Sequence, residues 1–132
     1  EMDFFLKWRK DISQLPFLLI MGNHDILPTN WYQEAAIEVR NDYHLHQFSF
    51  IHDPAESPTT LDATRFVFSG HLHPGIIMRG MGKQTLRFPC FYFTENQAIL
   101  PAFSHFSGLA VIEPKKKDRV YAIVNKTILQ IQ

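Results

Sequence analysis

Apolar residues follow two different spacings, which divide the chain into a helical start and a strand-rich remainder. Residues 2–15 place apolar side chains at helical spacing, with polar residues between them, and Pro16 follows. This pattern predicts an amphipathic helix. The unbroken apolar run at 17–21 predicts a strand covered on both faces. A helix that leads into a buried strand is half of a βαβ unit, which indicates an α/β fold whose first strand lies outside these residues.

Further along, the pattern predicts one short helix at 31–36 and then mainly strands. Clusters of Gly, Pro and polar residues separate short apolar runs, as is typical of strands joined by turns. The loop at 56–60 is the longest break, and no internal domain boundary is visible. The expected strands cover residues 37–40, 48–52, 65–69, 76–79, 85–94, 98–103, 109–112 and 120–124.

Composition narrows the class of protein only slightly. The 132 residues carry no net charge, so bulk charge indicates neither a nucleic-acid nor a membrane partner. Twelve phenylalanines predict a phenylalanine-rich core, and the single cysteine, Cys90, excludes an internal disulfide and is interpreted as a buried, inert thiol. Neither a signal peptide nor a membrane-spanning stretch is recognisable, which favours a cytoplasmic protein.

Three apolar runs each end in a histidine or an amide. Gly22-Asn23-His24-Asp25 follows the first run, His52 ends the second, and Gly70-His71-Leu72-His73 follows the third. Open α/β sheets place their chemistry in loops at the ends of strands. Each piece alone has a plain interpretation as a turn or a surface histidine, but the three together are hard to obtain by chance. They predict a site for metal-assisted phosphoester hydrolysis.

The residue types fit that chemistry. If residues 71–73 continue a strand, the imidazoles of His71 and His73 face one site, and neutral imidazole binds zinc or manganese well. The Asn23 carbonyl is a hard oxygen ligand, and His24 is suited to protonate a leaving alkoxide. Asp25 is expected to orient the His24 ring by accepting its other N–H.

The three motifs resemble those of the calcineurin-like metallophosphoesterases. That family uses, in order, Asp-x-His, Gly-Asp-x-x-Asp/Asn, Gly-Asn-His-Asp/Glu, a lone His and Gly-His-x-His, and this sequence carries the last three. The closer resemblance is to the DNA-ligase-associated phosphoesterases (PdeM), a branch near the nuclease subunit SbcD. It rests on four segments, at residues 50–56, 69–75, 86–91 and 100–103 (Leu-Pro-Ala-Phe).

The resemblance implies a fold, a reaction and residue roles. The fold is a partial four-layer α/β/β/α sandwich, with residues 1–132 as the C-terminal part of one domain. Two divalent ions are implied, Mn²⁺ first, with Zn²⁺, Fe²⁺ or Mg²⁺ as alternatives. Asn23, His52 and His71 match ligands of one ion, His73 matches a ligand of the other, and His24 matches the catalytic histidine.

The chain also departs from the family pattern. Neither Asp-x-His nor Gly-Asp-x-x-Asp/Asn precedes Asn23, so the metal site is incomplete here and lacks its bridging carboxylate. We therefore expect these motifs upstream of Glu1 in the gene, and little activity from this chain alone.

Several functional alternatives stay open at this point. The first is a metal-dependent phosphodiesterase or nuclease linked to DNA repair, for which the resemblance implies association with a DNA ligase or helicase and no membrane contact. The second is a non-catalytic fragment or interaction module, and the third is a phosphatase of another branch. The substrate-binding residues and the oligomeric state are not predicted. His44, His46 and His105 match no family ligand and are interpreted as structural or surface residues.

Overall fold

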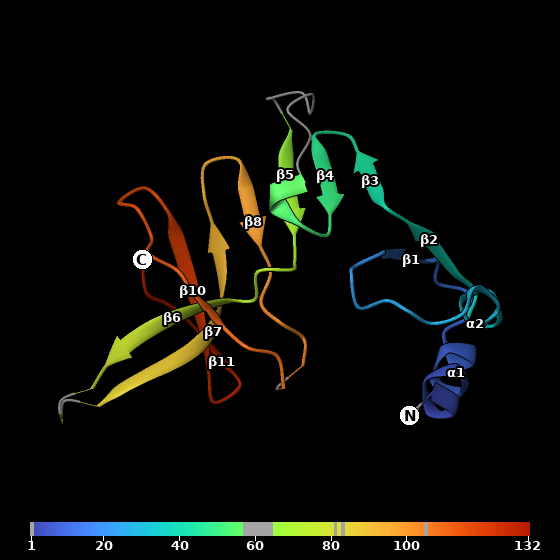
Figure 1. The fold of residues 1–132 in the computed structure, drawn as a ribbon, viewed down its shortest axis with the longest axis horizontal. Helices are drawn as coiled ribbons and strands as arrows, with labels where there is room; N and C mark the ends of the chain where they lie inside the picture. The colour runs from blue at the N-terminus through green and yellow to red at the C-terminus, as the bar shows by residue number, and fades with distance from the viewer. Residues whose placement is uncertain (1, 57–64, 81, 83, 105) are drawn as a thin grey trace.

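The computed structural model describes residues 2–56, 65–80, 82, 84–104 and 106–132 (Figure 1). Most of the loop predicted at 56–60 lies outside the described residues. The architecture is mixed α/β, with a large sheet and few helices, which confirms the predicted fold class. No helix in these ranges is both long and apolar enough to cross a membrane.

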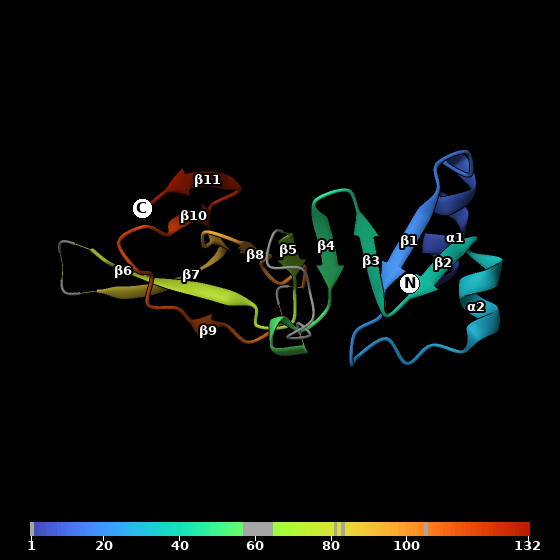
Figure 2. The ribbon, with the colours of Figure 1, turned by 90° about the horizontal axis from the view of Figure 1, so that it is seen from above.

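The N-terminal unit pairs two helices with a small parallel sheet. Strand β1 (Phe17–Ile20) lies parallel to β2 (Ile37–Arg40), and helices α1 (Met2–Asp11) and α2 (Thr29–Glu34) lie beside them (Figure 2). Phe5 and Trp8 of the predicted apolar face contact Trp31 and Phe17, respectively. Leu18 is 36% exposed, so the expectation that this strand is covered on both faces is wrong for the described residues.

The remaining strands form one mixed sheet in the order β11-β10-β7-β8-β5-β4-β3, with β6 paired to β7 and β9. Strands β4, β5 and β8 run parallel at its centre, so their carboxyl ends share one edge. A short 3₁₀ turn, Pro54–Glu56, follows β4. The strands are β3 (Asp42–Leu45), β4 (Phe48–Ile51), β5 (Phe66–Ser69), β6 (Pro74–Arg79), β7 (Thr85–Phe93), β8 (Gln97–Ile99), β9 (Ala110–Val111), β10 (Arg119–Val124) and β11 (Thr127–Gln130).

The buried core contains small and aliphatic side chains rather than phenylalanine. Its centre is the cluster Ile76, Cys90, Val120 and Ala122, between β6, β7 and β10. Cys90 is fully buried, as predicted, and burial raises the pKa of its thiol to about 11, so it is protonated at neutral pH. The predicted phenylalanine-rich core is wrong for the described residues, because phenylalanines such as those of β4 and β5 form a half-buried aromatic layer on one face of the sheet.

Arg9 lies in the last turn of α1 and connects this helix to the rest of the N-terminal unit by hydrogen bonds. Its side chain is buried, and its guanidinium donates to the carbonyls of Ile12 at 2.7 Å, Leu15 at 2.9 Å and Ala36 at 3.2 Å. The guanidinium also lies 4.3 Å from the centre of the Phe17 ring. These contacts close the turn after α1, so the helix ends at Asp11 instead of continuing to the predicted residue 15.

Replacing Arg9 with alanine should destabilise the fold. Arg9→Ala removes three charge-assisted hydrogen bonds to backbone carbonyls, so we expect a loss of about 3 kcal/mol in the free energy of unfolding. Urea denaturation measures this loss. Lys10→Ala, at the exposed neighbouring position, is the control and should stay within about 0.5 kcal/mol of the parent; equal losses in both variants would show that the buried contacts of Arg9 carry no special stability.

Candidate active site at the carboxyl ends of β1, β4 and β5

Three segments distant in sequence meet at one edge of the fold. His52 directly follows β4, His71 lies two residues after β5, and Asn23 lies three residues after β1. The backbone N–H of Gly70 donates to the carbonyl of His52 at 3.0 Å, which keeps the ends of β4 and β5 together. The two imidazoles are therefore neighbours, with ring centres 5.0 Å apart and planes at 80°.

Three polar atoms converge within this cluster of Asn23, His52 and His71, which we call the ligand triplet. His52 Nε2 lies 2.9 Å from Asn23 Oδ1 and 3.0 Å from His71 Nδ1. A proton on His52 Nε2 satisfies the asparagine oxygen but removes the lone pair that His71 Nδ1–H would need. A proton on His71 instead leaves the oxygen without a donor. One two-centre hydrogen bond at His52 Nε2 therefore satisfies only one of the two contacts, whereas a cation that faces three lone pairs would satisfy both.

Gly22 is necessary for this convergence. A Cβ atom at position 22 would lie 2.6 Å from His52 Cε1 and 2.7 Å from His52 Nδ1, closer than real contacts allow. The imidazole of His52 thus packs directly on the Gly22 backbone, which brings it to Asn23 in the next position. Glycine here permits close approach of a ring, a role that its small size alone explains.

Gly22→Ala should therefore displace the His52 ring and weaken metal binding by the ligand triplet. The matched control is Gly70→Ala at the same edge, where a Cβ atom would meet nothing within 4 Å. Isothermal titration with MnCl₂ measures the difference. Equal affinity in the two variants would contradict the proposed packing role of Gly22.

Asp53 joins the site, although sequence reasoning gave it no role. One of its carboxylate oxygens accepts from the Ala55 backbone N–H at 2.8 Å, and the other lies 3.6 Å from His71 Nε2. The negative charge of the Asp53 carboxylate beside His71 Nε2 favours the tautomer of His71 that carries its proton on Nε2. The lone pair of His71 Nδ1 then faces His52. The only sequence signal was position: Asp53 directly follows a candidate ligand.

The backbone between β5 and β6 differs from the prediction. His71 and His73 lie in the connection after β5, not on a strand, so the argument from strand alternation is wrong. Both residues adopt left-handed backbone, with φ of 45° and 49°, and Leu72 N–H donates back to Gly70 at 2.6 Å. Such conformations are costly for non-glycine residues and are concentrated at functional sites. The sharp turn after Gly70, rather than a pleat, directs the His71 ring to His52.

The remaining predicted residues lie nearby but outside the triplet. His24 is exposed, next to Asn23, and its ring has no hydrogen-bond partner among the described residues. The Asp25 carboxylate accepts from the Gly22 backbone N–H at 2.7 Å, so within the described chain it closes the 22–25 turn; the predicted bond to His24 is not found there. His73 is half-buried, and its ring makes no hydrogen bond to the triplet among the described residues.

The donor set suits a divalent cation of intermediate hardness. Two imidazole nitrogens and one amide oxygen are ligands that manganese, iron and zinc accept. The described residues contain no group of three or more His, Cys, Asp or Glu side chains placed to hold an ion. The third member of this triplet is an amide, and carboxylate ligands are missing from it.

Two other predicted features take structural roles. His44 contacts the buried Ser49 hydroxyl at 3.0 Å, while His105 lies outside the described residues. The lysine run 115–117 belongs to a turn held by Asp118, which accepts from the Lys115 backbone N–H and from the Tyr92 hydroxyl, each at 2.7 Å. The lysine run predicts a solvated hairpin turn, but among the described strands this turn joins no paired ones, because β9 pairs with β6, whereas β10 pairs with β7 and β11.

Comparison with known proteins agrees with a partial metallophosphoesterase-like α/β fold. No protein-family model matches the chain, and neither does any curated protein. Among solved structures, the chain is similar to the crystal structure of Pseudomonas putida nuclease MPE, with a TM-score of 0.79 and 30% sequence identity. The similarity covers 98% of this chain and 60% of the nuclease chain, so the chain spans somewhat over half the length of that neighbour.

Proposed function

We propose that this chain carries part of the active site of a metal-dependent phosphodiesterase that acts on nucleic acid. The observation that carries the proposal is the ligand triplet, in which three polar atoms from distant segments converge with separations of 2.9 and 3.0 Å. The nuclease neighbour supports the substrate class, because it shares the fold over nearly the whole chain.

The residue types of the triplet support particular ions. Imidazole nitrogens favour manganese, iron or zinc over magnesium, and the amide oxygen of Asn23 is a ligand that manganese also accepts.

The residues take distinct roles in this proposal. Asn23 Oδ1, His52 Nε2 and His71 Nδ1 hold the cation, and His73 is assigned to a second one. A bound divalent cation activates water and neutralises charge on phosphate oxygens. His24, exposed beside Asn23, is placed to protonate the leaving alkoxide. Asp53 positions the His71 ring through its other nitrogen.

The family and branch belong to the same proposal. The three motifs and the nuclease neighbour support a metallophosphoesterase of the calcineurin-like kind. The PdeM branch, a role in DNA repair and association with a DNA ligase or helicase rest on the sequence resemblance alone. A non-catalytic module is the second candidate, favoured by one observation: the triplet supplies only neutral ligands, which hold a divalent ion more weakly than carboxylates do.

An assay of manganese-dependent phosphodiester cleavage distinguishes the hydrolase from the non-catalytic module. We expect the protein to cleave bis-p-nitrophenyl phosphate and a single-stranded oligonucleotide with MnCl₂ and not with EDTA. The 132 residues alone should cleave both poorly, since they supply no carboxylate to the triplet. If the full-length protein binds manganese but cleaves neither compound, the hydrolase proposal fails and the module remains.

A further inference from the structure

The segment that follows β8 bonds to the backbone of the candidate site at two points, one before His71 and one at His73. Leu100 N–H donates to the carbonyl of Ser69 at 2.8 Å, two residues before His71. Ten residues later, Ala110 N–H donates to the carbonyl of His73 at 3.1 Å. The described residues between them therefore leave and rejoin the sheet beside the His71–His73 connection, and we call residues 100–104 and 106–109 the edge loop (orange, below β8 in Figure 1).

The ends of the edge loop are fixed. At its return, Leu109 packs so tightly on Gly75 that a Cβ atom at position 75 would lie 2.9 Å from Leu109 Cβ. Within the loop, Ser104 accepts from the backbone N–H of Phe106 at 3.1 Å, through its hydroxyl, and from that of Ser107 at 3.4 Å, through its carbonyl. A loop anchored in this way presents its side chains in a defined position, which lowers the entropy cost of binding.

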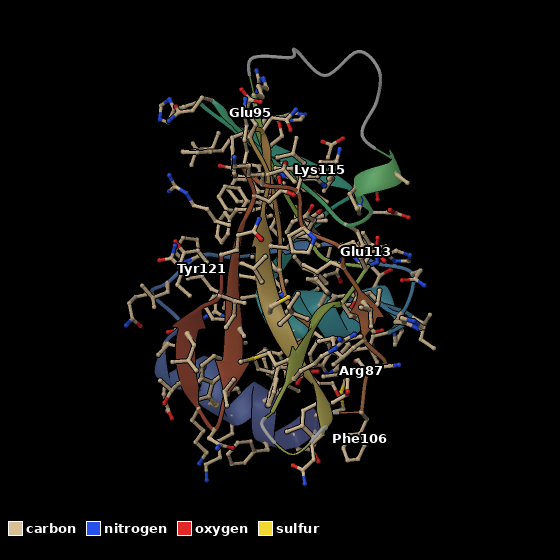
Figure 3. The ribbon with its side chains drawn as sticks, turned by 90° about the vertical axis from the view of Figure 1, so that its left-hand side faces the viewer. Arg87, Glu95, Phe106, Glu113, Lys115 and Tyr121 are labelled. Carbon is tan, nitrogen blue, oxygen red and sulfur yellow. The ribbon has the colours of Figure 1, made fainter. Side chains whose placement is uncertain are left out.

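This loop carries two phenylalanines that the protein leaves in solvent. Phe103 is 107% exposed and Phe106 is 100% exposed, whereas the phenylalanines of β4 and β5 are half-buried. In Figure 3 the Phe106 ring lies at the edge of the molecule, clear of the strands. Fully exposed aromatic rings are unfavourable in water. Two of them lie within four residues of each other, on a loop whose two ends bond to the carbonyls of Ser69 and His73, and this arrangement suggests a ligand.

The chemistry of the loop favours bases as that ligand. Apart from His105, the segment 100–109 contains no ionisable side chain, so it offers little to phosphates. Aromatic faces stack on any unpaired nucleobase, with little dependence on sequence. A protein partner is less well matched, because a stable interface needs a continuous surface of about 800 Å² per partner, and here two separate rings are flanked by serine and glycine.

We propose that Phe103 and Phe106 form a stacking platform for unpaired bases of single-stranded nucleic acid. This inference rests on the proposed function, since it takes the bound strand to be the substrate. Both ends of the edge loop bond to residues next to the His71–His73 connection, so a strand bound on the loop would lead from there to the ligand triplet. The platform thus selects single strands, because paired bases in a duplex do not expose their faces.

Fluorescence anisotropy with a labelled 15-nucleotide oligothymidylate, in EDTA, tests the platform without cleavage. The full-length Phe103→Ala/Phe106→Ala variant should bind this probe at least about tenfold more weakly, since stacking on one aromatic ring contributes about that much per base. A labelled 15-residue abasic strand supplies the same phosphates without bases, and both proteins should bind it equally. Phe4→Ala is the matched control, because Phe4 is also highly exposed but lies on α1.

Three outcomes overturn the platform: wild type that does not bind oligothymidylate, a double variant that binds it as wild type does, or equal losses for both probes. A change in oligomeric state or Tm with unchanged binding assigns the rings to a protein contact and also overturns it. An oligouridylate arm distinguishes DNA from RNA as the source of the bases. Because binding is measured in EDTA, its failure is separable from a failure of manganese-dependent cleavage.

Discussion

His24→Ala is expected to abolish most of the turnover of the full-length protein while leaving its metal content unchanged. His24 directly follows Asn23 in the chain without being part of the ligand triplet, and its proposed task is to protonate the leaving alkoxide. General acid catalysis contributes about 10²–10⁴-fold, so kcat for a phosphodiester with a poor leaving group should fall by that factor. A substrate with a p-nitrophenolate leaving group should lose less, because it needs little protonation.

His71→Ala is the complementary variant and should show the opposite pattern. It removes a proposed ligand, so manganese content measured by elemental analysis should fall with activity, and added MnCl₂ should restore part of the rate. His44→Ala is the matched control, because that histidine lies on β3 and contacts Ser49. Full activity in His24→Ala would remove the proposed mechanism, and full manganese content in His71→Ala would remove the ligand assignment.

Asp53→Asn is expected to weaken manganese binding by about 10–100-fold, the usual effect of losing a group that orients a metal ligand. The carboxylate 3.6 Å from His71 Nε2 favours the proton on that nitrogen. Asparagine keeps the size of the side chain and can still accept from the Ala55 N–H, but it lacks the charge. Isothermal titration with MnCl₂ measures the affinity, and NMR of the His71 ring reports which nitrogen carries the proton.

Asp42→Asn is the control for charge removal. Asp42 lies 3.8 Å from His44 Nε2 on β3, so it reproduces a carboxylate–imidazole pair away from the triplet. The affinity of the Asp42→Asn variant for manganese should equal that of the parent protein. An Asp53→Asn variant with unchanged affinity and an unchanged His71 tautomer would show that the ring is positioned without help from this carboxylate.

Most elements were predictable because local pattern and tertiary environment agree. The runs before Asn23, His52 and Gly70 form β1, β4 and β5, nearly as expected. Strands β3 and β11 were not predicted. The first carries Asp42 and His44, and all of the second is exposed, so neither shows the buried periodicity that marks a strand; pairing with β4 and β10 holds them instead.

The site was predictable in membership but not in geometry. Sequence motifs placed Asn23, His52 and His71 at strand ends, and the structure brings these three together. The positions of His73 and Asp25 relative to their expected partners depend on left-handed backbone and on a turn hydrogen bond, which spacing does not encode. Asp53 and Gly22 act through contacts with residues 18 and 30 positions away, and such long-range contacts are invisible in a local pattern.

The ligand triplet draws its members from two different sheets. Asn23 follows β1 of the two-stranded sheet, whereas His52 and His71 follow strands of the nine-stranded one. A cation bound by all three residues would hold the two sheets together. It would add about 2.7 kcal/mol to the free energy of unfolding when the free cation concentration is a hundred times the Kd. Loss of the cation would then let the two sheets separate more readily at the β2–β3 junction, and limited proteolysis with and without added MnCl₂ measures this difference.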